Sequence, residues 1–228
     1  IIRNFAINEK NNYELVKTKL LNVKKNYAMF ADSRGVSGLV ENENFVNLSI
    51  RGINLKSIIR ISEYYSNRNN LKGIILQLDP HQFSSYRLSK NEDDLISDLL
   101  SEENYFFYIF RPQYSQYLSQ YWRHLPKKVF NLSKDKEKEN KVVNKLNPKQ
   151  SDRTTSIRVS TQTPLLNYSK TSHFSYLKKF LINLKSKNLK ICLISFPVHS
   201  NYVNYSNKNE IFKEIKNTFV TFSKQQQV

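Results

Sequence analysis

The chain has 228 residues, of which 39% are apolar and 13% aromatic, so it can bury one sizeable core, and we expect a single domain over residues 1–228. No apolar run approaches the roughly 20 residues of a membrane-spanning helix. The formal net charge is +17. Because the lysines are scattered rather than clustered, the charge indicates a solvated surface, and a nucleic-acid partner is not expected.

The single cysteine, Cys192, excludes an intrachain disulfide and a multi-cysteine zinc site. It lies within an apolar run, which predicts a buried structural thiol. The sequence has no dinucleotide-binding, phosphate-loop or zinc-protease motif, so we expect no cofactor. Asp79 and His81, separated by a proline, are too few ligands for a metal site, and we expect no metal either.

Four short apolar runs predict buried β-strands. They are residues 27–30, 45–50, 73–78 and 189–198. Apolar residues at helical spacing predict one helix after Asn54 and another after Ser172, with these two residues as N-caps. Strands that alternate with amphipathic helices predict an α/β fold of three layers, α/β/α, with a mostly parallel sheet of the flavodoxin-like type.

Two segments interrupt this alternation. Residues 91–126 are rich in tyrosine and phenylalanine and predict a helical insertion, whereas residues 127–164 are too polar to offset their ordering entropy and predict a disordered loop. One more helix is expected from Glu210 onward. A doubly wound sheet would continue with another strand, so we expect that the sheet lacks its last strand and that the chain is truncated at its C-terminus.

The residues after the first strand form the most distinctive motif of the chain. Asp32-Ser33-Arg34-Gly35 follows the apolar run abruptly, and two of only four glycines, Gly35 and Gly38, lie here. Glycine permits tight turns and close approach of the backbone. A serine at such a strand-to-helix corner is a candidate nucleophile, and the competing interpretation is a helix N-cap.

Polar residues follow each predicted strand. The carboxyl ends of parallel strands meet at one rim of the sheet, where active sites lie. The rim is therefore expected to gather Asp32, Ser33, Arg34, Arg51, Gly52, Asn54, Asp79, His81, Gln82, His199, Ser200 and Asn201.

These strand ends resemble blocks I, II and III of the SGNH (GDSL-like) hydrolases, through Asp32-Ser33-Arg34, Gly52, and the polar turn at Asp79. The closer resemblance is to a bacterial branch that includes surface-polymer O-acyltransferase and D-alanine-transfer proteins. The resemblance implies a serine ester hydrolase or O-acyltransferase that acts on a carbohydrate or cell-surface polymer ester. It also implies a membrane-bound acyl donor protein as partner and an extracytoplasmic or membrane-associated location.

The resemblance also implies roles for individual residues. Ser33 would attack an acyl carbonyl, the N–H groups of Ser33 and Gly52 would bind the oxyanion, and Asp32 would belong to the catalytic motif. Contacts with the oxyanion or the substrate would come from Arg34, Asp79, His81 and Gln82.

The chain departs from the family pattern in three places. Ala31 replaces the leading glycine, Asp79-Pro80-His81 replaces the block III asparagine, and no Asp-x-x-His of block V occurs. We expect the catalytic histidine beyond Val228, with His199 or else His81 as the fallback base. The alternative is a noncatalytic protein of this fold that binds an anionic polymer through a basic rim.

Overall fold

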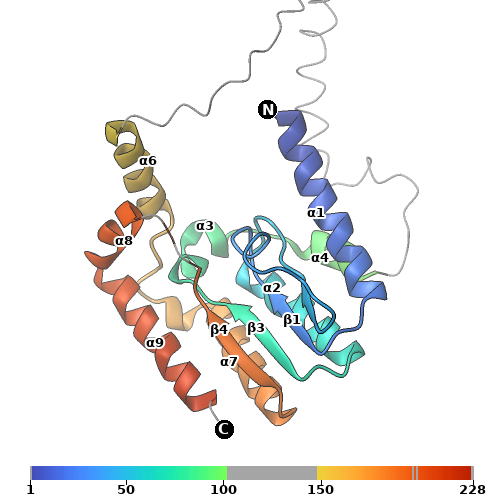
Figure 1. Ribbon diagram of the computed structural model, residues 1–228. Coiled ribbons are helices and arrows are strands. Elements are labelled where there is room, and N and C mark those ends of the chain that lie inside the picture. The colour runs from blue at the N-terminus through green and yellow to red at the C-terminus, as the bar shows by residue number, and fades with distance from the viewer. Residues whose placement is uncertain (1, 102–147, 197, 199, 227–228) are drawn as a thin grey trace, which may run out of the picture.

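The computed structural model describes residues 2–101, 148–196, 198 and 200–226 (Figure 1). Its sheet has four parallel strands in the order β2-β1-β3-β4. They are β1 (Tyr27–Phe30), β2 (Phe45–Asn47), β3 (Gly73–Gln77) and β4 (Lys190–Ile194). Helices flank the sheet, which confirms the predicted α/β class with a parallel sheet, and the strand order is that of the first four strands of a flavodoxin-like fold.

One row of strand residues faces the main helical layer. Ala28 of β1 pairs with Val46 of β2 on one side and with Ile74 of β3 on the other, and Ile74 pairs in turn with Ile191 of β4. Side chains alternate between the two faces of a strand, so this row points to the same face of the sheet. All four side chains belong to the core cluster or pack against it.

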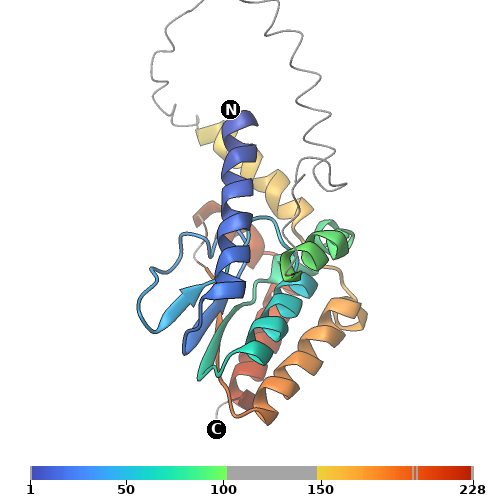
Figure 2. The same ribbon diagram turned by 90° about the vertical axis from the view of Figure 1, so that its right-hand side faces the viewer.

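The layer behind the sheet is made by α2 (Leu55–Arg68) and α7 (Ser172–Ser186), as Figure 2 shows from the side. The predicted N-cap of α2 is confirmed, because the Asn54 side chain accepts a hydrogen bond from the Ser57 N–H at 2.9 Å. The N-cap of α7 is Thr171 rather than Ser172, and its hydroxyl accepts from the Phe174 N–H at 3.3 Å.

Aromatic contacts join the sheet to its helices. The rings of Phe30 in β1 and Tyr65 in α2 meet edge to face with centroids 6.1 Å apart, and both side chains are buried. The ring of Phe83, in the 3-10 turn η1 (Pro80–Phe83), packs against that of Phe219 in α9 (Glu210–Gln226), with the ring centroids 6.1 Å apart. The helix predicted from Glu210 onward is thereby confirmed, and it packs beside β4 (Figure 1).

The remaining elements lie around this core. At the opposite side from α9 is α1 (Ile2–Asn22), whose Tyr13 hydroxyl donates to Asp98 of α4 (Asp93–Leu100) at 2.6 Å. The shorter elements are α3 (Ser85–Leu88), η3 (Tyr168–Lys170) and α8 (Ser200–Asn207). Within the described residues, no helix combines the length and the apolar character needed to cross a bilayer.

The prediction of a disordered loop over residues 127–164 is wrong for its last part, because α6 (Pro148–Thr161) is a helix. Its composition is polar, but Val159 is 8% exposed and belongs to the core cluster, and α6 packs against α8. Tertiary contacts thus supply the apolar burial that composition alone did not indicate. In the predicted helical insertion, α4 is helical, whereas residues 102–147 lie outside the described part of the chain.

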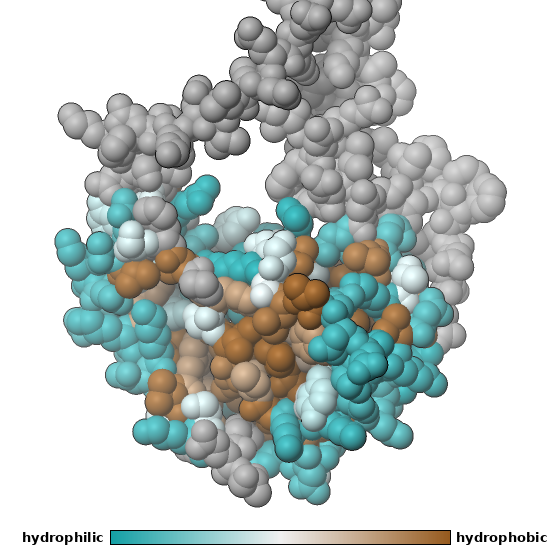
Figure 3. Space-filling view, in the orientation of Figure 1, coloured by the Kyte–Doolittle hydropathy of each residue, from teal (hydrophilic) through white to brown (hydrophobic). Residues whose placement is uncertain are grey.

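The prediction of a buried Cys192 is also wrong, because this thiol is exposed. Cys192 lies in the edge strand β4, between Ile191 and Leu193, which pack against the core. Its side chain points to the opposite face of the sheet, as does that of its register partner, the half-buried Ile75. Figure 3 shows apolar residues gathered at the middle of the face toward the viewer.

Candidate functional site

The loops after β1 and β3 meet at the point where the strand order reverses. From β1 the chain runs to β2 on one side, and from β3 it runs to β4 on the other side. In parallel sheets, a crevice that can bind a ligand forms where the connections diverge in this way. Asp32 follows β1 after one further residue, Ala31, and Asp79 follows β3 in the same way, after Leu78. Both carboxylates are buried.

Asp32 is the centre of one hydrogen-bonded cluster at this rim. Its Oδ1 accepts from the Arg34 N–H at 3.0 Å, and its Oδ2 lies 3.1 Å from Nε2 of His81 and 3.3 Å from Nη2 of Arg87. Burial alone would raise the pKa of Asp32, but the hydrogen bond from His81, the Arg34 N–H and the Arg87 guanidinium together lower it to about 2. Asp32 is therefore ionised at neutral pH.

His81 is neutral in the same pair. Its side chain is 2% exposed, and this burial lowers the pKa of the imidazole, with the nearby Arg34 charge acting in the same direction. An ionised carboxylate can only accept, so the neutral ring donates its Nε2–H to Asp32. This hydrogen bond assigns the tautomer and leaves Nδ1 as the basic nitrogen.

Asp79 is the centre of a second cluster. Its Oδ2 accepts from Nη1 of Arg34 at 2.9 Å and from the Gln77 amide, and its Oδ1 accepts from the Ser195 hydroxyl. Gln77 also accepts the main-chain N–H of Asp32 at 2.8 Å through Oε1. One buried amide thus joins the carboxylate after β3 to the backbone after β1.

Ser33 lies beside these clusters with its side chain exposed. Residues 33–38 form turns, and no described helix begins between β1 and β2, so the expected strand-to-helix corner and the helix N-cap interpretation are wrong. The Ser33 hydroxyl has no hydrogen-bond partner among the described residues. His81 is bonded to Asp32 instead.

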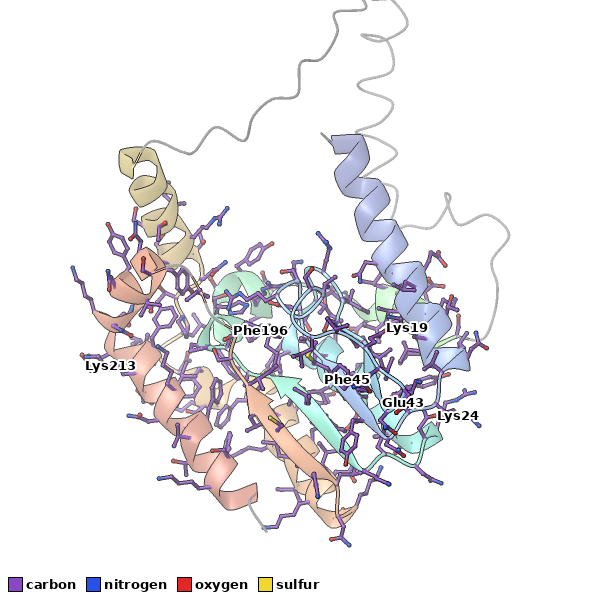
Figure 4. The ribbon with its side chains drawn as sticks, in the orientation of Figure 1. Lys19, Lys24, Glu43, Phe45, Phe196 and Lys213 are labelled. Carbon is purple, nitrogen blue, oxygen red and sulfur yellow. The ribbon has the colours of Figure 1, made fainter. Side chains whose placement is uncertain are left out.

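The glycines of this loop serve close packing. A Cβ on Gly35 would overlap Ala31 and the Ser49 hydroxyl, and a Cβ on Gly38 would overlap the ring of Phe196. Figure 4 shows Phe196 just beyond the end of β4. The loop that carries Ser33 is therefore pressed against the segments after both β2 and β4.

Gly52 stands in the turn after β2 with φ at +75°, in the left-handed region that favours glycine. Its carbonyl accepts from Nη1 of Arg87 at 2.9 Å and from Nζ of Lys90 at 2.7 Å. Two cations thus fix the peptide group that follows Gly52. Through Arg87, this turn is connected to Asp32.

Six of the predicted rim residues fall into three groups. Asp32, Arg34, Asp79 and His81 are brought into direct contact. Gln82 is buried, and neither polar atom of its side chain has a partner among the described residues. His199 lies outside the described residues.

Three residues of the site were not predicted. Gln77 is a buried polar residue at the end of the apolar strand β3. A polar residue in that position could have been recognised from the sequence as a candidate site residue. Ser195 was hidden because the strand was predicted to run to residue 198, whereas it ends at Ile194. Arg87 lies in a short helix with no distinguishing pattern, so nothing in the sequence indicated it.

The charges of the site are balanced locally. The carboxylate of Asp32 is matched by Arg87, and that of Asp79 by Arg34. In the described part of the chain, no three His, Cys, Asp or Glu side chains come close enough together to hold a metal ion. The arrangement can bind and orient groups by hydrogen bonding, and the exposed hydroxyl of Ser33 lies beside it.

Comparison with known proteins found no match: no family model, no curated protein and no solved structure is significantly similar to this chain.

Proposed function

We propose that this protein is a serine-dependent ester hydrolase or O-acyltransferase that acts on an ester of a carbohydrate or a cell-surface polymer. The observation that carries the proposal is the position of Ser33. Its exposed hydroxyl, which has no hydrogen-bond partner in the described part of the chain, follows the buried Asp32 at the carboxyl end of a central strand, beside the point where the strand order reverses.

The proposed reaction uses Ser33 as the nucleophile. Its Oγ attacks the acyl carbonyl carbon, the alcohol leaves, and water or a second hydroxyl then takes the acyl group from the serine. The N–H groups of Ser33 and Gly52 are the proposed oxyanion donors. The resemblance of Asp32-Ser33-Arg34 and Gly52 to SGNH blocks I and II supports these roles.

The proposal requires a base that takes the proton of Ser33. His81 suits this role poorly, because its Nε2 is bonded to Asp32 and its ring is buried, whereas Ser33 is exposed. We therefore propose as the base a histidine of the block V type, if the natural chain continues past Val228, with His199 as the fallback. By the same resemblance, we propose a membrane-bound protein as the acyl donor and a location outside the cytoplasm or at a membrane.

Labelling with a fluorophosphonate, which reacts with activated serines, tests the proposal. We expect one label per chain on the peptide that contains Ser33, and loss of labelling in Ser33→Ala. Ser37→Ala is the matched control, because Ser37 is an exposed serine four residues along the same loop. Absence of labelling from the folded wild-type chain, or equal labelling of Ser33→Ala, would contradict the proposal.

A second function, binding of an anionic polymer without catalysis, is favoured by one observation. Arg51, directly before Gly52, is exposed and has no carboxylate partner among the described residues. This alternative predicts that binding of alginate, a polyuronate, survives Ser33→Ala but weakens in Arg51→Ala and at high salt. If wild-type protein binds alginate in this way and is not labelled at Ser33, the binding function replaces the catalytic one.

A further inference from the structure

We infer that Arg87 is a positioning residue that holds the Ser33 loop (residues 31–38) and the Gly52 turn (residues 51–53) at a fixed separation. The inference rests on the proposed function, which needs the Ser33 hydroxyl and two backbone N–H groups in one geometry. The main-chain ladder between the two segments ends where the Ile50 N–H donates to the Ala31 carbonyl at 3.0 Å, so contacts beyond the sheet must fix the Gly52 turn against Ser33.

The contacts of Arg87 reach both loops. Nη1 donates to the carbonyl of Gly52 at 2.9 Å and to that of Ile53 at 3.0 Å, while Nη2 lies 3.3 Å from Oδ2 of Asp32. Asp32 is the residue directly before Ser33. A single side chain thus touches the neighbour of the proposed nucleophile and the residue of the proposed oxyanion donor.

The chemistry of the side chain suits this bridging role. The guanidinium group is planar and presents its donors in a rigid fork, whereas a lysine offers one compact ammonium on a flexible stem. Arg87 is 8% exposed, so its hydrogen bonds face little competition from water. The ionised carboxylate of Asp32 compensates for the burial of its charge.

The backbone that carries Arg87 is itself anchored. The Arg87 N–H donates to the carbonyl of Ser84 at 3.0 Å, and the Ser84 hydroxyl donates to the carbonyl of His81 at 2.8 Å. Asp32 therefore receives both His81 and Arg87 from one short segment after β3. The loops after β1, β2 and β3 meet in this arrangement. Arg87, from the segment after β3, donates hydrogen bonds both to Asp32 after β1 and to Gly52 after β2.

Glycine amide signals test the bridge without any activity. The chain has four glycines, so a protein labelled with ¹⁵N-glycine gives four amide signals, which single Gly→Ala variants assign. Gly35 reports on the Ser33 loop, because its N–H donates to the Asp32 carbonyl at 3.0 Å, and Gly52 reports on its own turn. Gly73, at the start of β3, is the internal reference.

We expect Arg87→Met and Arg87→Lys to move both the Gly35 and the Gly52 signals and to leave that of Gly73 in place. Arg60→Met is the matched control, because Arg60 is a partly exposed arginine in α2 that pairs with Asp93 instead. It should move none of the three. If Arg87→Lys moves only Gly52, or neither loop signal, the bridge is refuted; the retained signal of Gly73 shows that the variant is folded.

Fluorophosphonate labelling then tests the positioning role. We expect both Arg87 variants to label Ser33 tenfold or more slowly than wild type at saturating probe, with a smaller change in probe affinity, because misalignment acts on the reaction step. Wild-type labelling rates in variants whose Gly35 and Gly52 signals have moved would overturn the positioning role. Failure of wild type to label would instead count against the proposed function, while the glycine signals still decide whether Arg87 joins the loops.

Discussion

The Nε2 atom of His81 lies 3.1 Å from Oδ2 of Asp32, and both side chains are almost completely buried. The pKa of the carboxyl is lowered to about 2, and burial lowers the pKa of the imidazole. The pair therefore consists of a carboxylate and a neutral ring, and the positive charge that balances Asp32 comes from Arg87.

This pair makes the free energy of unfolding depend on pH in two steps. The unfolded chain protonates His81 at its ordinary pKa of 6.5, whereas the folded chain does so only at a lower pH. The unfolded state thus binds more protons in this range, and stability falls as the pH drops below 6.5. Asp32 adds a second loss of about 2 kcal/mol between its ordinary pKa of 3.8 and its folded pKa of about 2.

Urea denaturation at a series of pH values measures both steps. His81→Asn removes the titrating ring, so we expect a shallower loss of stability between pH 7 and pH 5 than in wild type. Since His173 also has a lowered pKa, part of the slope should remain in this variant. An unchanged slope in His81→Asn would contradict the assignment of a buried neutral His81.

Two buried glutamines provide a matched comparison. Gln77 bonds the Asp32 N–H and Asp79, whereas the side-chain amide of Gln82 has no partner among the described residues. Gln77→Leu leaves the buried Asp32 N–H without the Gln77 oxygen and removes one of the three donors to the Asp79 carboxylate, and we expect a loss of about 2 kcal/mol or more. Gln82→Leu removes an unbonded polar group and should be neutral or stabilising. Equal effects in thermal or urea unfolding would refute the Gln77 bridge.

His173, the second residue of α7, is buried, and neither ring nitrogen has a partner among the described residues. Burial lowers its pKa, and the charge of Lys56 acts in the same direction. We expect His173→Leu to raise the free energy of unfolding by about 1 kcal/mol at pH 7, and by more at pH 5.5, where the unfolded wild type gains a proton. Ser175→Ala, an exposed change in the same helix, is the control. Destabilisation by His173→Leu at both pH values would show that the ring is bonded in the native state.

Alanine substitutions at Gly52 and Gly35 should differ in cost. A Cβ on Gly52 would meet nothing nearer than Nζ of Lys90 at 3.7 Å, so only the left-handed φ of +75° opposes it, and we expect a loss of about 1 kcal/mol. A Cβ on Gly35 would overlap Ala31 and Ser49, both in the packed interior, so its cost should reach about 2 to 3 kcal/mol. The reverse order of costs in urea denaturation would contradict the packing of the Ser33 loop.

The sequence indicated the elements of this fold better than the contacts between them. Apolar runs located all four strands, and Asn54 marked the start of α2, because strand burial and helix capping are local properties. The topology brought Asp32 and His81 to one rim, as expected for parallel strands. Arg87 escaped notice because its role arises from three loops that meet in space. The polar composition of α6 gave no sign that Val159 would be buried.

Cys192 shows most directly how the tertiary structure can differ from what the local sequence pattern predicts. An apolar run predicts burial, but β4 is one of the two edge strands of the described sheet, and Cys192 points away from the core that Ile191 and Leu193 contact. Because the chain has one cysteine, a thiol reagent such as 5,5′-dithiobis(2-nitrobenzoate) reports on this site without mutagenesis. We expect one thiol per chain to react in the native protein at close to the rate seen in 6 M guanidinium chloride, since no unfolding is needed to expose it. Reaction slowed by a factor of a hundred or more would contradict the exposure of this thiol.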